Sequence, residues 1–279
     1  MPDVRIGVLS DLHCELEPAG SRWINVFEPE HLDDRTDAAL AWFSEVEVDL
    51  ILLLGDVVQF ANLSDLEHLF ARLATADVAP LATVDGNHDL RLGDQFADCA
   101  REHGIRLLHE EPLEQVTGVG VGRGPAPPQY VGQLAGWGGG ADIVVVASHF
   151  PVLSEASKVA AAGLPYAGDL VNRLELEGRL RSDSRPKLIL SGHIHARCST
   201  HDGPLLQFTV GAVIEPPFDA TLVEIDGTSV RRTARRLGEI AVTDPVFAAD
   251  DELWQWTGDR WELQPLASSA ASTRAVSQT

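Results

Sequence analysis

The sequence predicts an α/β fold, a layered sandwich with two β-sheets, and two patterns along the chain support this prediction. Up to about residue 195, short apolar runs alternate with segments of helical spacing, as they do in βα units. After that point, strand-like runs follow one another with Gly and Asp turns and without long helical segments between them. The 279 residues are enough to bury a sizeable core.

The strands expected in the first pattern are apolar runs, and the most continuous of them are typical of strands covered on both faces. They occupy residues 4–10, 48–54, 81–84, 105–109, 142–147 and 187–190. The helices expected between them occupy residues 36–47, 64–75, 95–103 and 169–181. A capping box from Ser64 to Glu67 predicts the start of the second helix, and Gly104 predicts the end of the third.

The rest of the chain is expected to contain loops and a β meander. The later strands are expected at residues 205–213, 220–225 and 229–233. Residues 118–140 are rich in Gly and Pro, which predicts mainly loop with a short helix near residues 130–134. Residues 250–266 carry Trp254, Trp256 and Trp261 in an expected hairpin around residues 257–259. Packing onto the sandwich edge is the simplest explanation for these tryptophans, and a homodimer surface or a substrate lid remains open.

Composition and charge narrow the class of protein. The net charge of −21 disfavours a broad nucleic-acid groove, because an acidic surface repels phosphate backbones. A small phosphorylated substrate stays compatible, since bound cations can reverse the field inside a site. The three cysteines have no paired spacing, and we find neither a secretory signal pattern nor an apolar run of membrane-spanning length. We therefore expect a cytoplasmic protein without a membrane partner.

Five short clusters of metal-ligand residue types stand where apolar runs end. They are Asp11-Leu12-His13, Gly55-Asp56, Gly86-Asn87-His88-Asp89, His149 and Gly192-His193-Ile194-His195. Carboxylate, imidazole and amide oxygen are the ligands that hold a pair of hard or borderline divalent metals. Asp11 and His13 are two residues apart, so an extended segment would point both toward one metal. The two carboxylate oxygens of Asp56 can bridge two cations.

The order of these clusters and the residues within them resemble the motifs of the calcineurin-like metallophosphoesterase family, from about residue 4 to about residue 196. The resemblance implies a four-layer α-β-β-α sandwich, with two mixed β-sheets flanked by helices, and hydrolysis of phosphate esters at two Mn, Fe or Zn ions. It implies one metal site made of Asp11, His13, Asp56 and His195, and a second made of Asp56, Asn87, His149 and His193. We expect a catalytic domain at residues 1–240 and a β extension packed on it at 241–267. The small and polar residues at 268–279 predict a disordered tail.

The resemblance also implies that His88 is not a metal ligand. His88 would lie over the metal pair, where it contacts the phosphate or protonates the leaving oxygen, and Asp89 would orient it. The residue types agree with this role, because imidazole groups titrate near neutral pH and a neighbouring carboxylate favours proton transfer. Many relatives have Asp or Asn three residues after the bridging aspartate, and this chain has Gln59 there.

Three functions are open from the sequence. The first is hydrolysis of a small phosphomonoester or phosphodiester, cyclic nucleotides included. The second is a DNA exonuclease of the repair type, which the acidic charge disfavours. The third is a non-catalytic interaction module that uses the tryptophan-bearing segment. A protein that has kept this fold and lost its metals is a further alternative, and the complete ligand set argues against it. Specificity is expected from loops at residues 31–35, 118–140 and 154–169, where Arg123 and Lys158 are candidate phosphate or base contacts, although solvated surface charge is the simpler explanation for both.

Overall fold

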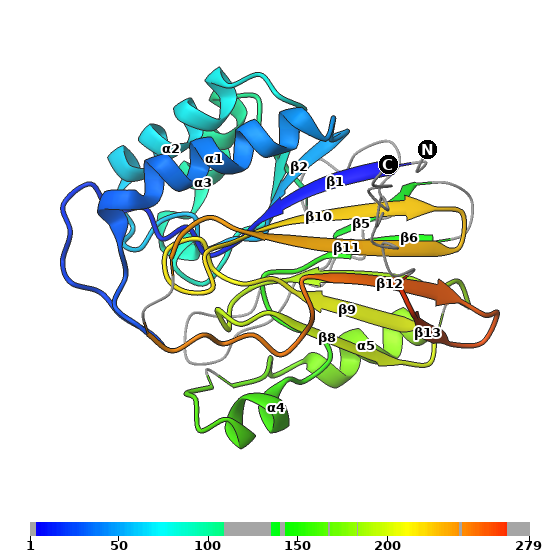
Figure 1. The fold of residues 1–279 in the computed structure, drawn as a ribbon. Coiled ribbons are helices and arrows are strands. Elements are labelled where there is room, and N and C mark those ends of the chain that lie inside the picture. Colours follow the sequence, from blue (N-terminus) through cyan, green and yellow to red (C-terminus); the bar gives the residue numbers. More distant parts are fainter. Residues whose placement is uncertain are drawn as a thin grey trace, which may run out of the picture.

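The computed structural model describes residues 4–108, 135–139, 143–166, 168–182, 184–239 and 242–266. In this part of the chain, two mixed β-sheets lie face to face, and helices cover their outer faces (Figure 1). This arrangement confirms the predicted four-layer α-β-β-α sandwich. None of the described helices is long and apolar enough to cross a membrane.

The larger sheet has eight strands among the described residues, in the order β13-β12-β11-β10-β1-β2-β3-β4. Its parallel half consists of β1 (Val4–Leu9), β2 (Leu50–Leu53), β3 (Leu81–Thr83) and β4 (Arg106–Leu107). Its antiparallel half adds β10 (Asp219–Asp226), β11 (Ser229–Arg236), β12 (Asp251–Trp256) and β13 (Trp261–Gln264). β1 joins the two halves, because it pairs in parallel with β2 and antiparallel with β10.

The smaller sheet has five strands in the described part, in the order β5-β6-β7-β9-β8. Its parallel centre consists of β6 (Ile143–Ala147), β7 (Lys187–Ser191) and β9 (Leu205–Thr209). β5 (Ala135–Gly139) and β8 (Cys198–Asp202) flank this centre and pair antiparallel with it. Each sheet therefore contains a group of parallel strands whose carboxyl ends share one edge.

The helices form the two outer layers. Those on the larger sheet are α1 (Leu32–Glu45), α2 (Leu63–Thr75) and α3 (Asp94–Glu102). Those beside the smaller sheet are α4 (Ala156–Ala161) and α5 (Arg173–Arg181). The short 3-10 helices η1 (Pro29–His31) and η2 (Asp89–Leu92) lie in the connecting segments.

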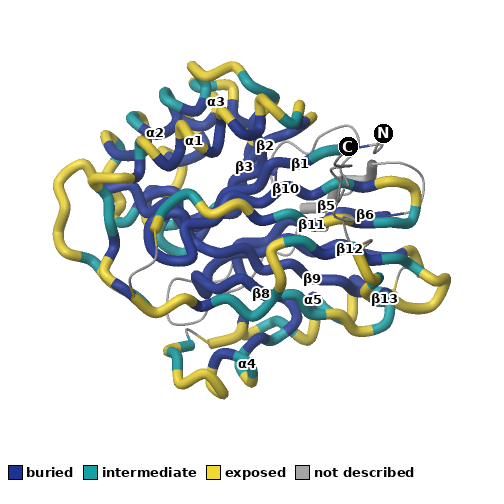
Figure 2. Tube along the Cα trace, viewed as in Figure 1, coloured by how far each residue is buried: buried dark blue, intermediate teal, exposed yellow. Residues whose placement is uncertain are grey.

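The core is built on the alternation of side chains along the strands, since successive residues of a strand point to opposite faces. In β2, Ile51 and Leu53 pack into the cluster under α1–α3, whereas Leu50 and Leu52 pack into the cluster between the sheets. Figure 2 shows the resulting buried centre and the exposed outer faces of the helices. Burial of each leucine side chain stabilises the folded protein by about 1.5–3 kcal/mol, so β2 is stabilised from both faces.

The tryptophan-bearing segment extends the larger sheet as the hairpin β12–β13, which confirms the expected hairpin. Trp254 and Trp261 are buried in the cluster between the sheets, and Trp256 packs against that cluster. Packing therefore accounts for these side chains. The domain boundary at residue 240 stays an interpretation, and the expected tail at residues 268–279 lies outside the described residues.

Some local expectations differ from the structure. Residues 135–139 form β5 although their sequence is glycine-rich, because pairing with β6 stabilises the strand. Neither β8 nor α4 is indicated by the sequence, since β8 is mostly polar and α4 has only six residues. The cap of α2 is Asn62 and not Ser64, because the Asn62 side chain accepts the Ser64 N–H at 3.0 Å. α5 begins at Arg173 and not at residue 169, and the helix expected near residues 130–134 lies outside the described residues.

Candidate metal centre

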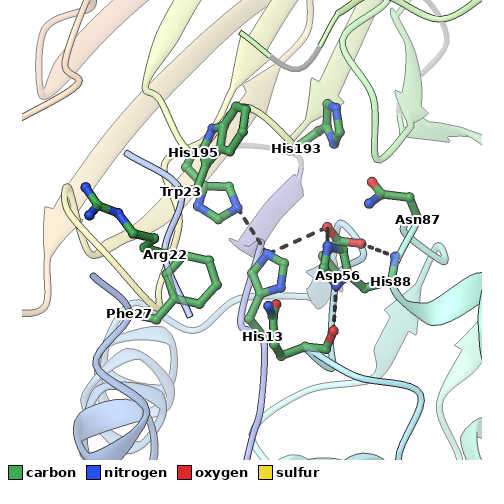
Figure 3. Close-up of a pocket in the computed structure, with 10 residues that line it drawn as sticks. His13, Arg22, Trp23, Phe27, Asp56, Asn87, His88, His193 and His195 are labelled. Atoms are coloured by element: carbon green, nitrogen blue, oxygen red, sulfur yellow. Dashed lines mark hydrogen bonds and ion pairs between the residues drawn. The ribbon is translucent and has the colours of Figure 1, made fainter. Parts of the chain in front are cut away.

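The predicted metal ligands come together where parallel strands of the two sheets end (Figure 3). Asp11 and Asp56 follow β1 and β2, Asn87 follows β3, and His149 and His193 follow β6 and β7. Loops at the carboxyl ends of neighbouring parallel strands meet at one edge of a sheet. All seven predicted ligands contribute an atom to this centre.

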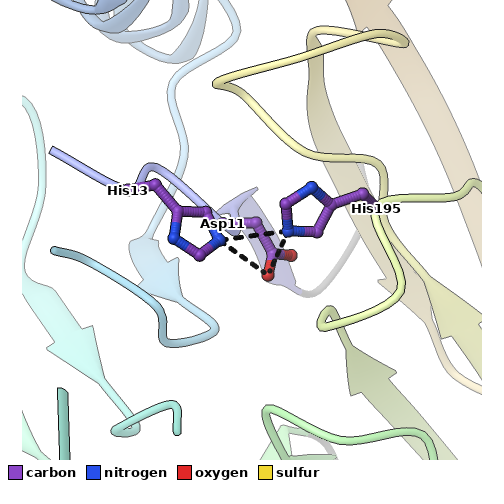
Figure 4. A group of neighbouring side chains, drawn as sticks. All are labelled: Asp11, His13 and His195. Carbon is purple, nitrogen blue, oxygen red and sulfur yellow. Dashed lines mark hydrogen bonds and ion pairs between the residues drawn. The ribbon is translucent and has the colours of Figure 1, made fainter. Parts of the chain in front are cut away.

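The first cluster contains Asp11, His13 and His195 (Figure 4). The Nε2 atoms of His13 and His195 are 3.0 Å apart, and His195 Nε2 is 3.4 Å from Asp11 Oδ1. Asp56 Oδ2 approaches this cluster at 3.6 Å from His13 Nε2. Ligand atoms that surround one ion at about 2.0–2.2 Å lie about 3–3.5 Å apart, so the spacing fits one metal.

The second cluster is centred on His149. Its Nε2 atom lies 3.2 Å from His193 Nδ1 and 3.2 Å from Asn87 Oδ1. Asp56 Oδ2 is 3.3 Å from the same Nε2 atom. The spacing again fits one metal with mixed nitrogen and oxygen ligands.

Asp56 lies between the two clusters, and one oxygen serves both. Oδ2 faces His13 on one side and His149 on the other, whereas Oδ1 accepts the backbone N–H of His88 at 2.9 Å. We expected both carboxylate oxygens to bridge the cations. In the structure, the oxygen that faces both clusters is Oδ2, and Oδ1 is hydrogen-bonded to the His88 amide.

The charge balance of the centre supports a cation site. Asp11 and Asp56 are buried, and neither pairs with a lysine or arginine in the described part of the chain. Buried carboxylates are normally paired with a cationic side chain or coordinate a metal. The residues present therefore fit two divalent ions.

The ligand residues have a strained backbone. Eight non-glycine residues in the described part have positive φ, and five of them are predicted ligands: Asp11, His13, Asp56, His193 and His195. Such conformations cost about 1–3 kcal/mol each and gather at functional sites. We expected an extended segment at Asp11 and His13. Instead, left-handed conformations with φ of 53° and 43° bring both side chains to the first cluster.

Two glycines allow the ligand segments to approach closely. A Cβ atom at Gly86 would overlap Asp56 Oδ1, and one at Gly192 would overlap Ser10 Oγ and lie 2.7 Å from Asp11 Oδ2. That Asp11 oxygen accepts the Ser10 hydroxyl at 2.7 Å and the His193 N–H at 3.0 Å. Gly86 of the GNHD motif (residues 86–89) and Gly192 of the GHIH motif (residues 192–195) are thus required, because a side chain at either position would collide with atoms around the ligand carboxylates.

Contacts on the far ring nitrogen orient two of the imidazoles. His149 Nδ1 lies 2.7 Å from the Leu54 carbonyl oxygen, and His195 Nδ1 lies 2.6 Å from Glu215 Oε1. Such contacts fix the tautomer that presents Nε2 to a metal. Sequence reasoning missed Glu215, because no motif marks a residue 20 positions after His195. Its signal is a fully buried carboxylate beside a ligand, which only the fold reveals.

The four histidines of the centre divide into two pairs by pKa. Burial lowers the pKa of His13 and of His193 to about 3. Burial opposes protonation of the other two as well, but Asp56 raises the pKa of His149 to about 9, and Asp11 and Glu215 raise that of His195 to about 10. Without metals, His149 and His195 therefore each carry a proton at neutral pH beside the buried carboxylates of Asp56 and Asp11. Bound cations would displace these two protons.

His88 borders the centre, and the structure changes the role expected for Asp89. We expected Asp89 to orient His88. Instead, His88 Nδ1 lies 2.6 Å from the Gln59 carbonyl oxygen.

The Asp89 carboxylate accepts the backbone N–H groups of Val57, Val58 and Gly86 at 2.8–3.2 Å. Burial and the charge of Asp56 raise the pKa of Asp89 to about 8, although the hydrogen bonds from these three amides lower it. Asp89 holds the loops around Asp56 together, and the contact that orients the His88 ring comes from Gln59.

A cavity of about 190 Å³ opens onto the ligands. Its described lining residues are His13, Arg22, Trp23, Phe27, Asp56, Gln59, Asn87, His88, His193 and His195. Arg22, Trp23 and Phe27 were not foreseen, because no motif marks the segment before η1.

The loops at residues 31–35 and 154–169, from which specificity was expected, contribute no described lining residue. Lys158 instead donates to the Ser199 carbonyl and pairs with Glu155 at 3.0 Å, which removes it as a phosphate contact. Arg123 lies outside the described residues.

The chain is similar to a known protein family and to several solved structures. A profile of the calcineurin-like phosphoesterase family matches residues 4–197. A dimetal phosphatase from Danio rerio is similar in structure, with a TM-score of 0.53 and 14% sequence identity over 86% of this chain and 98% of that one. An archaeal phosphodiesterase has a TM-score of 0.42 and 16% identity over 83% of this chain and all of that one. Zinc-bound Vps29 from Entamoeba histolytica has a TM-score of 0.42 and 12% identity over 86% and 96%. No curated protein sequence matches the chain.

At these identities, the similarity to the Danio rerio protein shows the fold alone. The family match carries more, because it covers more than half of the chain and every predicted ligand from Asp11 to His195. Members of this family bind two divalent metal ions, and the two ligand clusters fit that property. The chain therefore belongs to the calcineurin-like phosphoesterase family.

Proposed function

We propose that this protein hydrolyses small phosphate esters, either monoesters or diesters, with two divalent metal ions held in the two clusters. The observation that carries the proposal is the position of Asp56 Oδ2 between two complete ligand sets at the base of a cavity. Mn, Fe and Zn all accept such nitrogen and oxygen ligands. When bound, the two ions supply Lewis acidity toward phosphate oxygens and lower the pKa of a water molecule at the site.

His88 is proposed to protonate the leaving oxygen or to contact the phosphate. Its side chain is 27% exposed in the cavity wall, and its Nε2 atom is 4.0 Å from Asp56 Oδ2. Because Nδ1 donates to the Gln59 carbonyl, Nε2 is the ring atom free to exchange a proton with a substrate. Asp89 supports this geometry indirectly, since it binds the amides that flank Asp56.

The cavity supports a small substrate. A volume of about 190 Å³ admits a phosphate group and part of a leaving group. Trp23 and Phe27 offer an apolar wall for the leaving group, and the exposed Arg22 offers a positive charge at the rim. The net charge of −21 opposes the approach of a long polyanion. We therefore propose a small phosphorylated molecule as the substrate, rather than DNA.

Hydrolysis assays with the metal-loaded protein test this function. Specificity constants should be measured for a chromogenic monoester, a chromogenic diester, a cyclic nucleotide and duplex DNA under one metal condition. We expect turnover of at least one small ester and poor cleavage of DNA, improving as salt screens the surface charge. Efficient DNA degradation at moderate salt would favour the nuclease, and absence of turnover with bound metals would favour a non-catalytic module.

A matched pair of variants separates the site from general effects. Asp56→Asn removes the bridging charge, whereas Asp77→Asn makes the same substitution at an exposed position with the same φ of 48°. Asp77 lies just after α2 and outside the cavity lining. Turnover should fall sharply in the first variant and stay unchanged in the second.

A further inference from the structure

A buried glutamate behind the metal centre contacts both a predicted metal ligand and the cavity wall. Glu215 is fully buried and belongs to neither ligand cluster. Its Oε1 atom lies 2.6 Å from His195 Nδ1 and accepts the backbone N–H of Ile24 at 3.3 Å. Its Oε2 atom accepts the backbone N–H of Asn25. One carboxylate thus joins two parts of the chain that are far apart in sequence.

The segment that Glu215 holds is the wall containing Arg22, Trp23 and Phe27. This segment folds back on itself, because the Phe27 N–H donates to the Ser21 carbonyl at 2.9 Å and Trp23 to that of Asn25 at 3.1 Å. Figure 3 shows Arg22, Trp23 and Phe27 on one side of His13, with Asn87 and His88 on the other. The wall therefore faces any substrate bound over the ligands.

The wall also contacts the metal ligands directly. The ring of Phe27 stacks on His195 with centroids 5.6 Å apart and lies 5.0 Å from the ring of His13. A shift of the segment at residues 22–27 would thus disturb the first cluster, and a shift of His195 would disturb the wall. Glu215 is the polar contact that both share.

The donors around Glu215 explain why a charged group is buried there. A buried carboxylate is tolerated only where hydrogen bonds replace its hydration. Two backbone amides of the segment at residues 22–27 and the imidazole N–H of His195 supply them here. A neutral amide side chain could not accept all three, because one of its two polar atoms is a donor.

We propose that Glu215 is a positioning residue that couples the first metal site, through His195, to the substrate-facing wall at residues 22–27. The inference rests on the proposed function for its substrate arm, whereas its metal arm needs no turnover. Carboxylates behind a metal-bound histidine typically change metal affinity about 10–100-fold. Loss of Glu215 should therefore weaken one metal site and loosen the wall.

The test uses Glu215→Gln, with Glu155→Gln as the matched control. Glu155 is also fully buried and also accepts hydrogen bonds, from Thr200 and Gln207, but it lies outside the cavity lining. Calorimetric titration of the metal-free proteins with Mn²⁺ or Zn²⁺ should show one of two sites weakened about 10–100-fold in Glu215→Gln. Both sites should keep their affinity in Glu155→Gln.

Kinetics at saturating metal test the coupling to the wall. We expect kcat of Glu215→Gln to recover with excess metal, while KM for a small ester stays raised. Unchanged metal affinity, equal weakening of both sites, or a normal KM at saturating metal would each overturn the proposal. Glu215→Asp keeps the charge and serves if the glutamine variant does not fold; it should shift the same single site to a smaller extent. Two-site metal binding without turnover of any ester would refute the proposed function and leave the metal arm testable.

Discussion

The glycine of the GHIH motif offers a quantitative test of how the first ligand cluster is packed. In Gly192→Ala, the new Cβ atom would overlap Ser10 Oγ, lie 2.9 Å from Ser10 Cβ and lie 2.7 Å from Asp11 Oδ2. Rotation of the Ser10 hydroxyl cannot relieve the contact between the new Cβ atom at residue 192 and Ser10 Cβ, because this rotation does not move Ser10 Cβ. The Ser10 side chain is also fully buried and donates to Asp11, so the neighbouring backbone has to move.

The expected destabilisation follows from these contacts. Overpacking of a dense interior costs about 1–3 kcal/mol, and losing the Ser10 hydrogen bond to the Asp11 carboxylate costs about 1.5–3 kcal/mol. Gly192→Ala should therefore lower the free energy of unfolding of the metal-free protein by about 2.5–6 kcal/mol. Urea denaturation in the presence of a chelator measures this value. Gly178→Ala in α5 is the control, because its Cβ atom meets nothing within 4 Å and alanine favours a helix.

A second substitution makes the reasoning refutable. Ser10→Gly removes both Ser10 atoms that block residue 192, so the double variant should lose less stability than the sum of the single variants, with a coupling of about 1–3 kcal/mol. Additive effects within about 0.5 kcal/mol would show that the two residues do not collide. The explanation of the motif glycine would then be wrong.

Three further predictions concern the ligands and the proposed acid. His88→Ala should keep both metals and lose about 10²–10⁴-fold in kcat, with the smallest loss for acidic phenol leaving groups; equal losses across leaving groups would favour a purely electrostatic role. Asn87→Ala should weaken only the second metal site in a calorimetric titration, since Asn87 Oδ1 contacts His149 and not the first cluster; weakening of both sites would contradict this assignment. Metal binding at pH 7 should release about two protons, because the raised pKa values of His149 and His195, about 9 and 10, mean that both carry a proton which the metal must displace. Metal affinity should therefore rise with pH up to about 10, where the second of these protons is lost. Binding heats that do not depend on the ionisation enthalpy of the buffer would contradict the proton release.

The ligand set could be predicted because the ligands lie in short sequence motifs. Asp11 and His13 form one pair of residues two positions apart, and His193 and His195 form another. Each pair follows an apolar strand. The first pair follows β1 of the larger sheet and the second follows β7 of the smaller sheet, so the face-to-face packing of the two sheets brings the pairs together. What the sequence could not give is the backbone conformation, since positive φ at these residues results from the surrounding contacts.

The remaining features depend on contacts between distant segments. β5 and β8 are strands only because they pair with β6 and β9, while their own residues are glycine-rich or polar. Glu215 and Trp23 join the site through a fold that brings residues 190 positions apart within hydrogen-bond distance. Asp89 shows the same limit. Its motif places it beside His88, but the backbone turns its carboxylate toward Val57 and Val58.

The central claim is that two metals share the Asp56 carboxylate, and the metal content of three proteins tests it most directly. The wild type, Asp56→Asn and Asp77→Asn should be loaded with one metal, dialysed, and analysed for metal per chain. We predict two ions per chain in the wild type and in Asp77→Asn, and a loss from both sites in Asp56→Asn, since Asp56 Oδ2 lies within 3.6 Å of His13 and 3.3 Å of His149. Two ions retained in Asp56→Asn, or a single ion in the wild type, would contradict the account.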